Sequence, residues 1–150
     1  MFRGASALSL DVKGRLTLPT RYRQDIADLC DANMVITADP DACLLLYPRE
    51  VWLGIEEKIA GLPSLNKYSR TLQRILIGHA IEVDMDKSGR LLIPPTLRSF
   101  AGLDKQVMLV GQGKKFEIWD ESKWQQNTQQ WIDEIADKDE LIGDLESLSF

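Results

Sequence analysis

The chain has 150 residues, of which 44% are hydrophobic and 27% are charged, and its net charge is −5 at pH 7. This composition is typical of a soluble globular protein with a buried core, and no apolar run approaches the length of a membrane span. The first ten residues lack the apolar segment of a secretory signal. Cys30 and Cys43 lie in apolar surroundings without CxxC spacing, which predicts reduced core thiols in a cytoplasmic protein.

The negative charge is distributed unevenly along the chain. From Phe116 to Phe150 ten acidic residues stand against two lysines, whereas residues 1–115 carry 16 basic and 13 acidic residues. Because a ligand meets the local electrostatic field, the acidic whole-chain charge does not exclude a nucleic-acid partner. The acidic C-terminal part is predicted to be a solvated helix face.

A motif of nine residues occurs twice. DVKGRLTLP at 11–19 returns as DKSGRLLIP at 86–94, with Asp, Gly, Arg and Pro at the same spacing. A stretch in which apolar residues alternate with other residues precedes each motif, and a helix that begins at the proline follows it. Both copies then continue as strand, turn, strand and helix start, while the offset between them falls from 75 to 72 residues. The sequence therefore predicts two copies of one β-α-β-type unit, at 5–52 and 81–124.

Each copy of the motif predicts a tight hairpin turn. Gly14 and Gly89 allow the positive φ that such a turn needs. Asp11 and Asp86 can accept hydrogen bonds from backbone N–H groups within the turn. The alternation after each glycine directs leucine and isoleucine side chains inward and places the arginine on the solvent side.

Arg15 and Arg90 are the candidate binding residues. Considered alone, each could form an exposed ion pair with the aspartate four residues earlier, worth about 0–1 kcal/mol. Two matching arginines on one folded unit favour a binding site instead, because arginine suits bidentate contacts with guanine or phosphate. Five more basic residues are expected beside the turns: Lys13, Arg21 and Arg23 at the first, Lys87 and Arg98 at the second.

Residues 53–80 are predicted to form a helical connector. A helix over 49–61 places three apolar side chains on one face: Trp52, Ile55 and Ile59. A second helix over 66–77 has the spacing to bury Tyr68, Leu72 and Ile75. Its other side carries a basic stripe of Lys67, Arg70 and Arg74. A solvated or intersubunit face is favoured over a second DNA site for this stripe, because helix surface charges are usually solvated.

Residues 125–150 are predicted to form a helical acidic tail. Trp124, Trp131 and Ile135 have the spacing to bury one face of this helix. Leu141, Leu145 and Leu148 could extend the helix or dock on a neighbouring molecule, and the sequence leaves both open.

The sequence offers little for catalysis. His79 is the only histidine and is predicted to be structural, and one histidine with two separated cysteines cannot form an ordinary zinc site. The chain has no nucleophile motif, P-loop or dinucleotide-binding motif, and VGQGKK at 110–115 is predicted to be a turn between strands. We therefore expect no enzyme, no catalytic residue and no cofactor.

Six motifs follow one another along the chain: MFRG, DVKGRLTLPTRYR, LLLYP, LIGHA, MDKSGRLLIPPTLR and VMLVGQGKKFEIWD. Together they resemble the MraZ family of bacterial transcriptional regulators over nearly the whole length. The resemblance implies an α+β, β-rich fold. In that fold, two tandem AbrB-like swapped-hairpin units form a pseudo-two-fold β-barrel with flanking helices.

The resemblance also implies a DNA-binding site. The family's DxxxR motif maps onto both turns, with a glycine inside each and a lysine as a less firmly matched neighbour. The expected DNA-binding residues are Arg15, Arg90, Asp11, Asp86, Gly14, Gly89, Lys13 and Lys87.

The function implied is that of a sequence-specific, DNA-binding repressor of its own division and cell-wall gene cluster. Such a protein would bind G-rich direct repeats in double-stranded DNA as a homo-oligomeric ring, in the cytoplasm and at the nucleoid. Neither a membrane nor a small-molecule substrate is expected. An antitoxin-like protein-interaction module of the swapped-hairpin group is the alternative, because the acidic tail resembles segments that wrap a toxin. Two ordered copies in one chain favour DNA.

Overall fold

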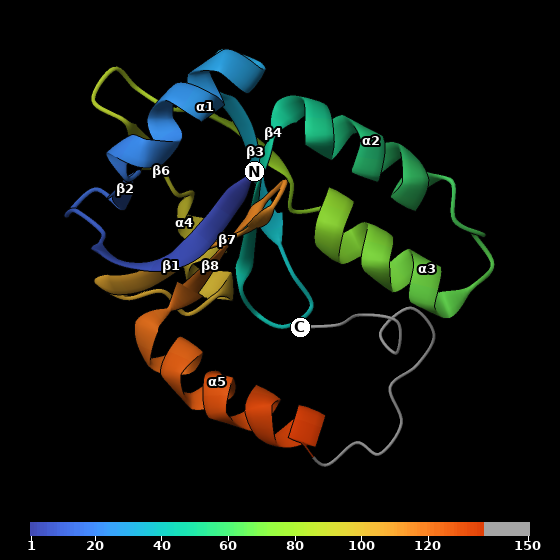
Figure 1. The fold of residues 1–150 in the computed structure, drawn as a ribbon. Helices are drawn as coiled ribbons and strands as arrows, with labels where there is room; N and C mark the ends of the chain where they lie inside the picture. The colour runs from blue at the N-terminus through green and yellow to red at the C-terminus, as the bar shows by residue number, and fades with distance from the viewer. Residues whose placement is uncertain (137–150) are drawn as a thin grey trace.

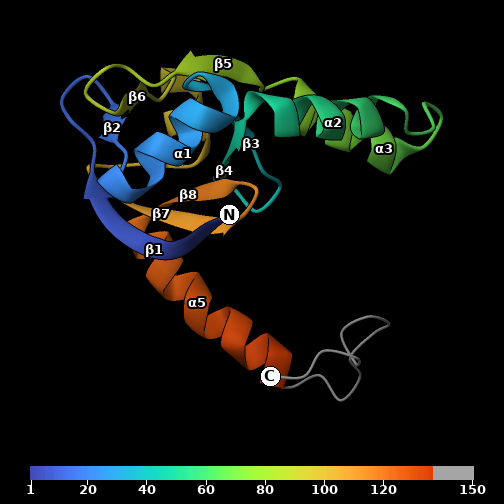
Figure 2. The same ribbon diagram turned by 45° about the horizontal axis from the view of Figure 1, so that its top comes forward.

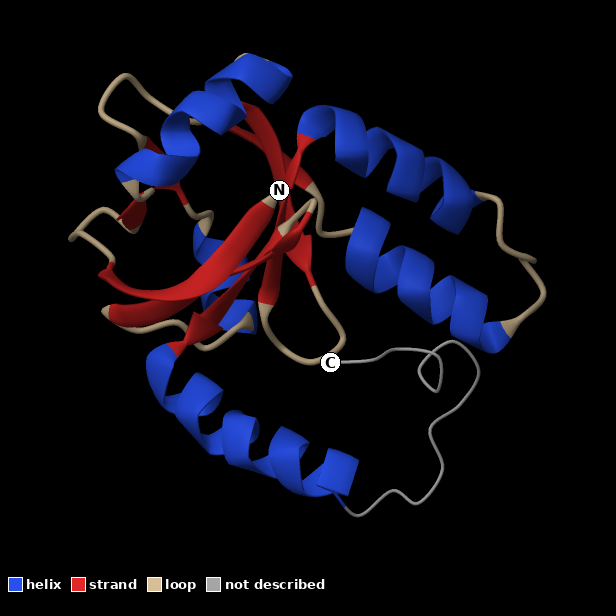
Figure 3. Ribbon diagram, viewed as in Figure 1, coloured by secondary structure: helices blue, strands red, loops and turns tan. Residues whose placement is uncertain are grey.

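The computed structural model describes residues 1–136 and shows a strand-rich, mixed α/β fold (Figures 1 and 3). The first copy of the repeat contributes six elements: β1 (Phe2–Ser9), β2 (Arg15–Thr17), α1 (Thr20–Cys30), β3 (Asn33–Ala38), β4 (Leu44–Pro48) and α2 (Arg49–Ala60). The second copy contributes the same series: β5 (Ile81–Asp84), β6 (Arg90–Leu92), α4 (Pro95–Phe100), β7 (Gln106–Gly113), β8 (Phe116–Asp120) and α5 (Glu121–Ala136). Two helical segments lie between the copies: α3 (Lys67–Leu72) and the π-helical η1 (Gln73–Ile77). This order confirms the predicted duplication.

The two copies exchange strands in the main sheet. Six strands pair antiparallel in the order β1-β7-β8-β4-β3-β5, so that the first strand of each copy pairs with the third strand of the other. Strands β4 and β8 join the copies in the middle, and β2 and β6 form a separate two-stranded ribbon. These pairings do not link into a closed ring within residues 1–136, so closure of the predicted barrel is not confirmed.

The pairing between copies is symmetric about a pseudo-two-fold axis. In the middle of the main sheet, Leu45 lies opposite Glu117, its equivalent in the second copy. In the ribbon, Leu16 lies opposite its own equivalent, Leu91. The two hairpin turns therefore flank the ribbon at its opposite ends, and both lie on the same side of the molecule (Figure 1).

The register locates the three residues that the second copy lacks. Leu8 pairs with Val107 and Val83 with Met34, so the third strands correspond at an offset of 73 rather than the expected 72. The fourth strands correspond at the expected 72. Two residues are therefore missing between the ribbon and the third strand, and one in the β7–β8 turn.

The core forms where the two copies meet. Leu16 and Leu18 are buried, and so are their equivalents Leu91 and Ile93, as the alternation predicted. Each of these side chains stabilises the fold by roughly 1.5–3 kcal/mol on leaving water. Because the side chains between them point outward, burial of this set fixes which residues the ribbon presents to solvent.

Helices α2 and α3 form a hairpin that projects from the sheet (Figure 2). Trp52 of α2 is buried and packs against Tyr47, with 5.5 Å between ring centroids. The side chain of Asn66 caps α3 by accepting hydrogen bonds from two backbone N–H groups. The predicted helix over 66–77 is thus present, although its second half is π-helical.

The predicted burial of one stripe along α3 and η1 is wrong in part. Tyr68 is 79% exposed and Leu72 is 37% exposed, whereas Ile75 packs against the main core. Gln73 donates a side-chain hydrogen bond to the carbonyl of Ile59 in α2, at 3.1 Å. The start of η1 therefore faces α2, and the stripe of α3 that carries the tyrosine faces outward.

Helix α5 packs on the sheet through tryptophans. Trp124 and Trp131 lie against Trp119, with ring centroids 6.3 and 5.2 Å away. Ile135 was expected on the same buried face but is 69% exposed, because α5 runs past the edge of the sheet (Figure 2). The leucines predicted to extend this helix, at 141, 145 and 148, lie outside the described residues.

Candidate nucleic-acid interface

The first hairpin turn is organised by Asp11. Its Oδ1 accepts hydrogen bonds from the backbone N–H groups of Lys13 and Arg15, at 3.0 and 2.8 Å. Its Oδ2 accepts from the Nε of the Arg15 side chain at 2.6 Å. Gly14 adopts φ +84°, as the turn requires. One carboxylate therefore fixes both the backbone of the turn and the direction of its arginine.

The second turn repeats this arrangement. Asp86 accepts from the backbone N–H groups of Ser88 and Arg90, both at 2.9 Å, and from the Nε of Arg90 at 2.9 Å. Gly89 adopts φ +78°. Both glycine conformations are as predicted, and both arginines form the ion pair that the sequence analysis considered as the alternative to a binding site. The predicted lysines are not equivalent, because Lys13 corresponds to Ser88, and Lys87 corresponds to Val12.

These hydrogen bonds lower the pKa of both turn carboxylates. The pKa of Asp11 lies below its usual 3.8, chiefly because the backbone N–H of Arg15 donates to it. The pKa of Asp86 is lowered in the same way by the backbone N–H of Arg90. In each turn, the guanidinium of the same arginine lowers the pKa further, and partial desolvation opposes the shift.

We expect a pH-dependent stability from these two groups. A carboxylate with a lowered pKa in the folded state stabilises that state at neutral pH, and the stabilisation disappears as the pH falls through the lowered pKa. The midpoint of thermal unfolding of wild type should exceed that of Asp11→Asn with Asp86→Asn at neutral pH. The difference should shrink below about pH 4. A difference that stays constant down to about pH 3 would show that the charges contribute nothing.

The β2–β6 ribbon presents both arginines on one face. Leu16 and Leu91 point inward, so the outward face carries Arg15 and Thr17 from β2 with Arg90 and Leu92 from β6. Arg15 pairs with Leu92, and Thr17 pairs with Arg90, which places the two arginines diagonally across the ribbon. Each guanidinium uses only its Nε within residues 1–136, and its terminal nitrogens donate to no protein group.

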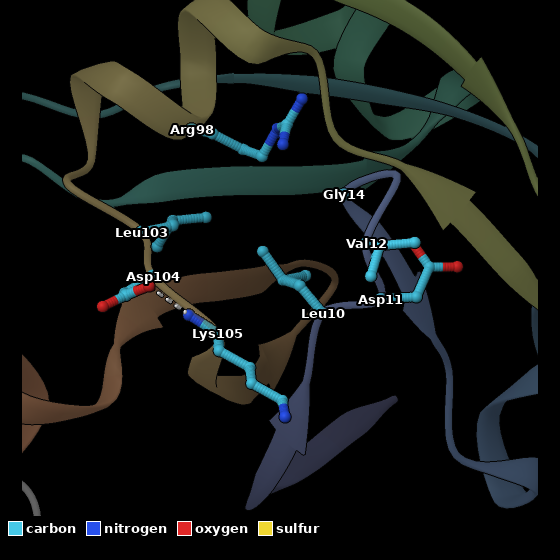
Figure 4. A pocket seen from close by; sticks show the side chains of 8 residues that line it. All are labelled: Leu10, Asp11, Val12, Gly14, Arg98, Leu103, Asp104 and Lys105. Atoms are coloured by element: carbon cyan, nitrogen blue, oxygen red, sulfur yellow. Dashed lines mark hydrogen bonds between the residues drawn. The ribbon is translucent and has the colours of Figure 1, made fainter.

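Two further arginines lie beside the turns, each at the turn of the other copy. Arg98 of α4 extends toward the first turn (Figure 4), and a Cβ placed on Gly14 would lie 2.5 Å from its Cζ. Arg23 of α1 lies against Gly89 in the same way. The sequence analysis placed Arg23 at the first turn and Arg98 at the second. The exchange of the copies reverses that assignment.

A main-chain carbonyl holds each of these two arginines in place. The Nε of Arg23 donates to the carbonyl of Leu18 at 2.8 Å, and the Nε of Arg98 donates to the carbonyl of Ile93 at 3.1 Å. Both carbonyls belong to the residue just before the proline that starts the helix. Sequence reasoning could identify the paired arginines four residues after each proline, but not the turn that each one supports.

Arg21 does not belong to either turn. Its guanidinium donates to the Oγ of Ser6 at 2.7 Å and lies over the ring of Tyr22, 4.5 Å from the centroid. These contacts bind α1 to β1, so the expected place of Arg21 beside the first turn is wrong.

Each turn borders a shallow hollow. The first has a volume of about 340 Å³ and is shown in Figure 4. Its lining includes Asp11, Gly14 and Arg98, with Lys105 on the far side. The equivalent hollow at the second turn has about 360 Å³ and is lined in part by Arg23. Each hollow thus lies beside a turn arginine of the ribbon, and its lining carries both basic and acidic side chains.

The remaining candidate groups are structural. The Nδ1 of His79 lies 2.9 Å from the carbonyl of Ile75, which identifies it as a hydrogen-bond donor, as predicted. Cys43 is buried and Cys30 is half-buried, and burial raises the pKa of both thiols. Within residues 1–136 no cluster of three or more potential metal ligands occurs. No helix in that range is long and apolar enough to span a membrane.

The fold and its paired turns define a class of duplicated protein, in which two copies of one unit exchange strands and present a basic ribbon. A family model described as "MraZ protein, putative antitoxin-like" matches residues 1–75 and again residues 76–144. The chain belongs to the MraZ family.

Named relatives match over most of the chain. It is 50% identical to the transcriptional regulator MraZ of Nitrosospira multiformis over 149 residues, which cover 99% of both chains. It is 52% identical to the transcriptional regulator MraZ of Methylococcus capsulatus over 136 residues, 91% of this chain and 90% of the relative. The protein of the same name from Nitrosomonas europaea is 56% identical over 124 residues, 83% of this chain and 84% of the relative.

Proposed function

We propose that this protein regulates transcription by binding double-stranded DNA through the β2–β6 ribbon. The observation that carries the proposal is the pair of Asp–Arg turns that flank one exposed ribbon. A two-stranded ribbon fits the major groove of B-DNA, where an arginine can donate two hydrogen bonds to guanine. The names of the relatives support the regulatory role.

The Asp–Arg pair suits such a contact. In each turn the aspartate binds the Nε of the arginine, and the two terminal nitrogens remain available to a base or a phosphate. An arginine held in this way loses less side-chain entropy on binding than a free one. Arg23 and Arg98 add positive charge beside the turns, which favours the phosphate backbone.

The finer features follow from the resemblance to the family. The two AbrB-like units would occupy 5–52 and 81–124 and pack as a swapped-hairpin barrel, with a connector at 53–80 and an acidic tail at 125–150. The chain would assemble into a ring that binds G-rich direct repeats upstream of its own division and cell-wall gene cluster. It would act there as a repressor, in the cytoplasm and at the nucleoid.

The test is a gel-shift titration with DNA from upstream of the gene, at salt concentrations from about 50 to 200 mM. We expect wild type to bind with an affinity that falls steeply with salt. Arg15→Ala with Arg90→Ala should lose at least about tenfold at each turn, the value of one good bidentate contact. The backbone hydrogen bonds to both aspartates remain in this variant, so it should stay folded.

Two further variants separate recognition from charge. Lys114→Ala with Lys115→Ala removes the same charge at the other end of β7 from the turns and should bind like wild type. Arg15→Lys with Arg90→Lys keeps the charge but loses the bidentate geometry, so its affinity should be intermediate. If Arg15→Ala with Arg90→Ala binds as tightly as wild type, the two arginines are inert surface ion pairs and the proposal is wrong.

A further inference from the structure

We infer that Leu92 recognises the methyl group of a thymine in the DNA site and thereby gives the bound site a direction. The inference rests on the proposed function and names a specificity-determining residue of the same ribbon. Leu92 occupies in β6 the position that Thr17 occupies in β2, and it is 51% exposed. Its neighbours Leu91 and Ile93 are buried, so the alternation of the strand directs Leu92 to solvent. A large apolar side chain therefore lies on the same outward face as the two DxxGR arginines.

The strand register places Leu92 directly beside Arg15, its partner across the ribbon. The backbone N–H of Ile93 donates to the carbonyl of Gly14 at 3.0 Å, so the next pair along is a hydrogen-bonded one. Arg15 and Leu92 thus form a pair without backbone hydrogen bonds, in which Cα atoms are about 4.5 Å apart and side chains are closest. Bases along one DNA strand are about 3.4 Å apart, so a base that Leu92 contacts would lie within about two base pairs of the guanine that Arg15 contacts.

The chemistry of leucine selects one group in the major groove. A leucine side chain has no hydrogen-bond donor or acceptor, so it cannot pair with the polar edge of a base. The C5-methyl group of thymine is the apolar group that the base pairs present in this groove. Cytosine presents an amino donor instead, which a leucine would leave without a partner. Burial of one methyl group raises affinity roughly fourfold, so Leu92 favours thymine at the position that it contacts.

The other end of the ribbon has different chemistry at the equivalent positions. Thr17 pairs with Arg90, and its hydroxyl can both donate and accept a hydrogen bond, which suits several bases. The tips of the turns differ as well, because Val12 is fully exposed where the second turn has Lys87. Apolar side chains therefore flank Arg15 at its end of the ribbon, whereas polar side chains flank Arg90.

This difference breaks the pseudo-two-fold symmetry of the ribbon. A protein with two identical ends matches a palindromic site, because the symmetry of the site mirrors that of the protein. A ribbon with one apolar and one polar end matches a site whose two ends differ, and it binds that site in one orientation. Sites that follow one another in the same direction then hold every bound chain the same way round. This behaviour fits the direct repeats of the proposed function.

The test replaces thymine by deoxyuridine, which removes only the methyl group. Fragments with one repeat from upstream of the gene carry the replacement at one thymine at a time, and fluorescence anisotropy measures their affinity at about 50 mM salt. We expect wild type to lose about fourfold in affinity at one of these thymines. Leu92→Ser should bind the thymine and deoxyuridine forms of that fragment equally. The matched control, Thr17→Ser, removes a methyl group from the equivalent position and should keep the fourfold preference.

The outcomes separate this inference from the proposed function. Each preference compares two DNA fragments with one protein, so a loss of folded protein cannot imitate a loss of preference. Binding by wild type without a preference at any thymine overturns the inference and leaves the proposed function. A preference that Leu92→Ser retains, or that Thr17→Ser loses, also overturns the inference, because another side chain then contacts the methyl group. Absence of wild-type binding to every fragment rejects the proposed function, and the inference with it.

Discussion

A DNA fragment with several direct repeats should bind wild type about 10²–10⁴-fold more tightly than a fragment with one repeat. One chain offers a single ribbon with two arginines of the DxxGR turns, and such a site loses affinity quickly as salt rises. In an assembly, the first ribbon to bind brings its neighbours close to the next repeats. Each later contact is then effectively intramolecular, so the total affinity rises without any stronger single contact.

The measurement is fluorescence anisotropy with fragments of equal length that carry one, two or three repeats. The matched control keeps three repeats but changes the spacing between them, which should return the affinity to that of a single repeat. Equal affinity of wild type for one repeat and for three contradicts the proposed mechanism.

A flat ring and straight DNA cannot match over several repeats, so we expect the ring or the DNA to deform on binding. Bending a site of 20–30 base pairs by 40–90° costs about 1–6 kcal/mol. The gain in binding free energy for each added repeat should therefore be smaller than the value calculated from the affinity for a single repeat without deformation. A gain that does not diminish between two and three repeats would show that no deformation is needed.

The local structure of each turn was predictable from the sequence. Asp and Gly at fixed spacing before an alternating strand determine the hydrogen bonds and the positive φ of the turn, because all of these interactions lie within five residues. The outward direction of Arg15 and Arg90 follows from the same alternation. The duplication was equally predictable, because both copies contain the same nine-residue motif.

The partners of each turn were not predictable from spacing alone. Whether Arg23 supports its own turn or that of the other copy depends on strand exchange, which pairs β1 with β7 and β5 with β3. Nothing in a short window of sequence distinguishes an exchanged pair from an unexchanged one. The change of offset in the sequence revealed the three-residue deletion. Only the strand register of the structure showed that the deletion is divided between two loops.

The exposed stripe on α3 shows a second limit. Tyr68, Leu72 and Ile75 have helical spacing, and spacing indicates that the side chains share a face but not what covers that face. Only Ile75, which lies in η1, reaches the core, because α3 projects beyond the sheet. The same reason accounts for Ile135 on α5. Both departures concern helices that extend past the sheet.

Substitution of a turn glycine should be coupled to an arginine of the opposite copy. Gly14→Ala places a Cβ at φ +84°, which costs about 1–2 kcal/mol in any background. In wild type the new Cβ would also collide with the guanidinium of Arg98, whose Nε holds the carbonyl of Ile93. In an Arg98→Ala background the collision is absent. The double variant should therefore be more stable than the sum of the single effects predicts, by about 0.5–3 kcal/mol.

The matched control combines the same glycine substitution with a substitution of the arginine in the same copy of the repeat. Gly14→Ala with Arg23→Ala should be additive within about 0.5 kcal/mol, because Arg23 lies against Gly89 instead. The mirror cycle should couple Gly89→Ala to Arg23→Ala and not to Arg98→Ala. Urea unfolding of each variant gives the free energies for both cycles. Coupling within a copy and additivity between copies would show that each arginine supports its own turn. Such a result would mean that the two units do not exchange strands in solution. The ribbon could then no longer present both DxxGR arginines on one face.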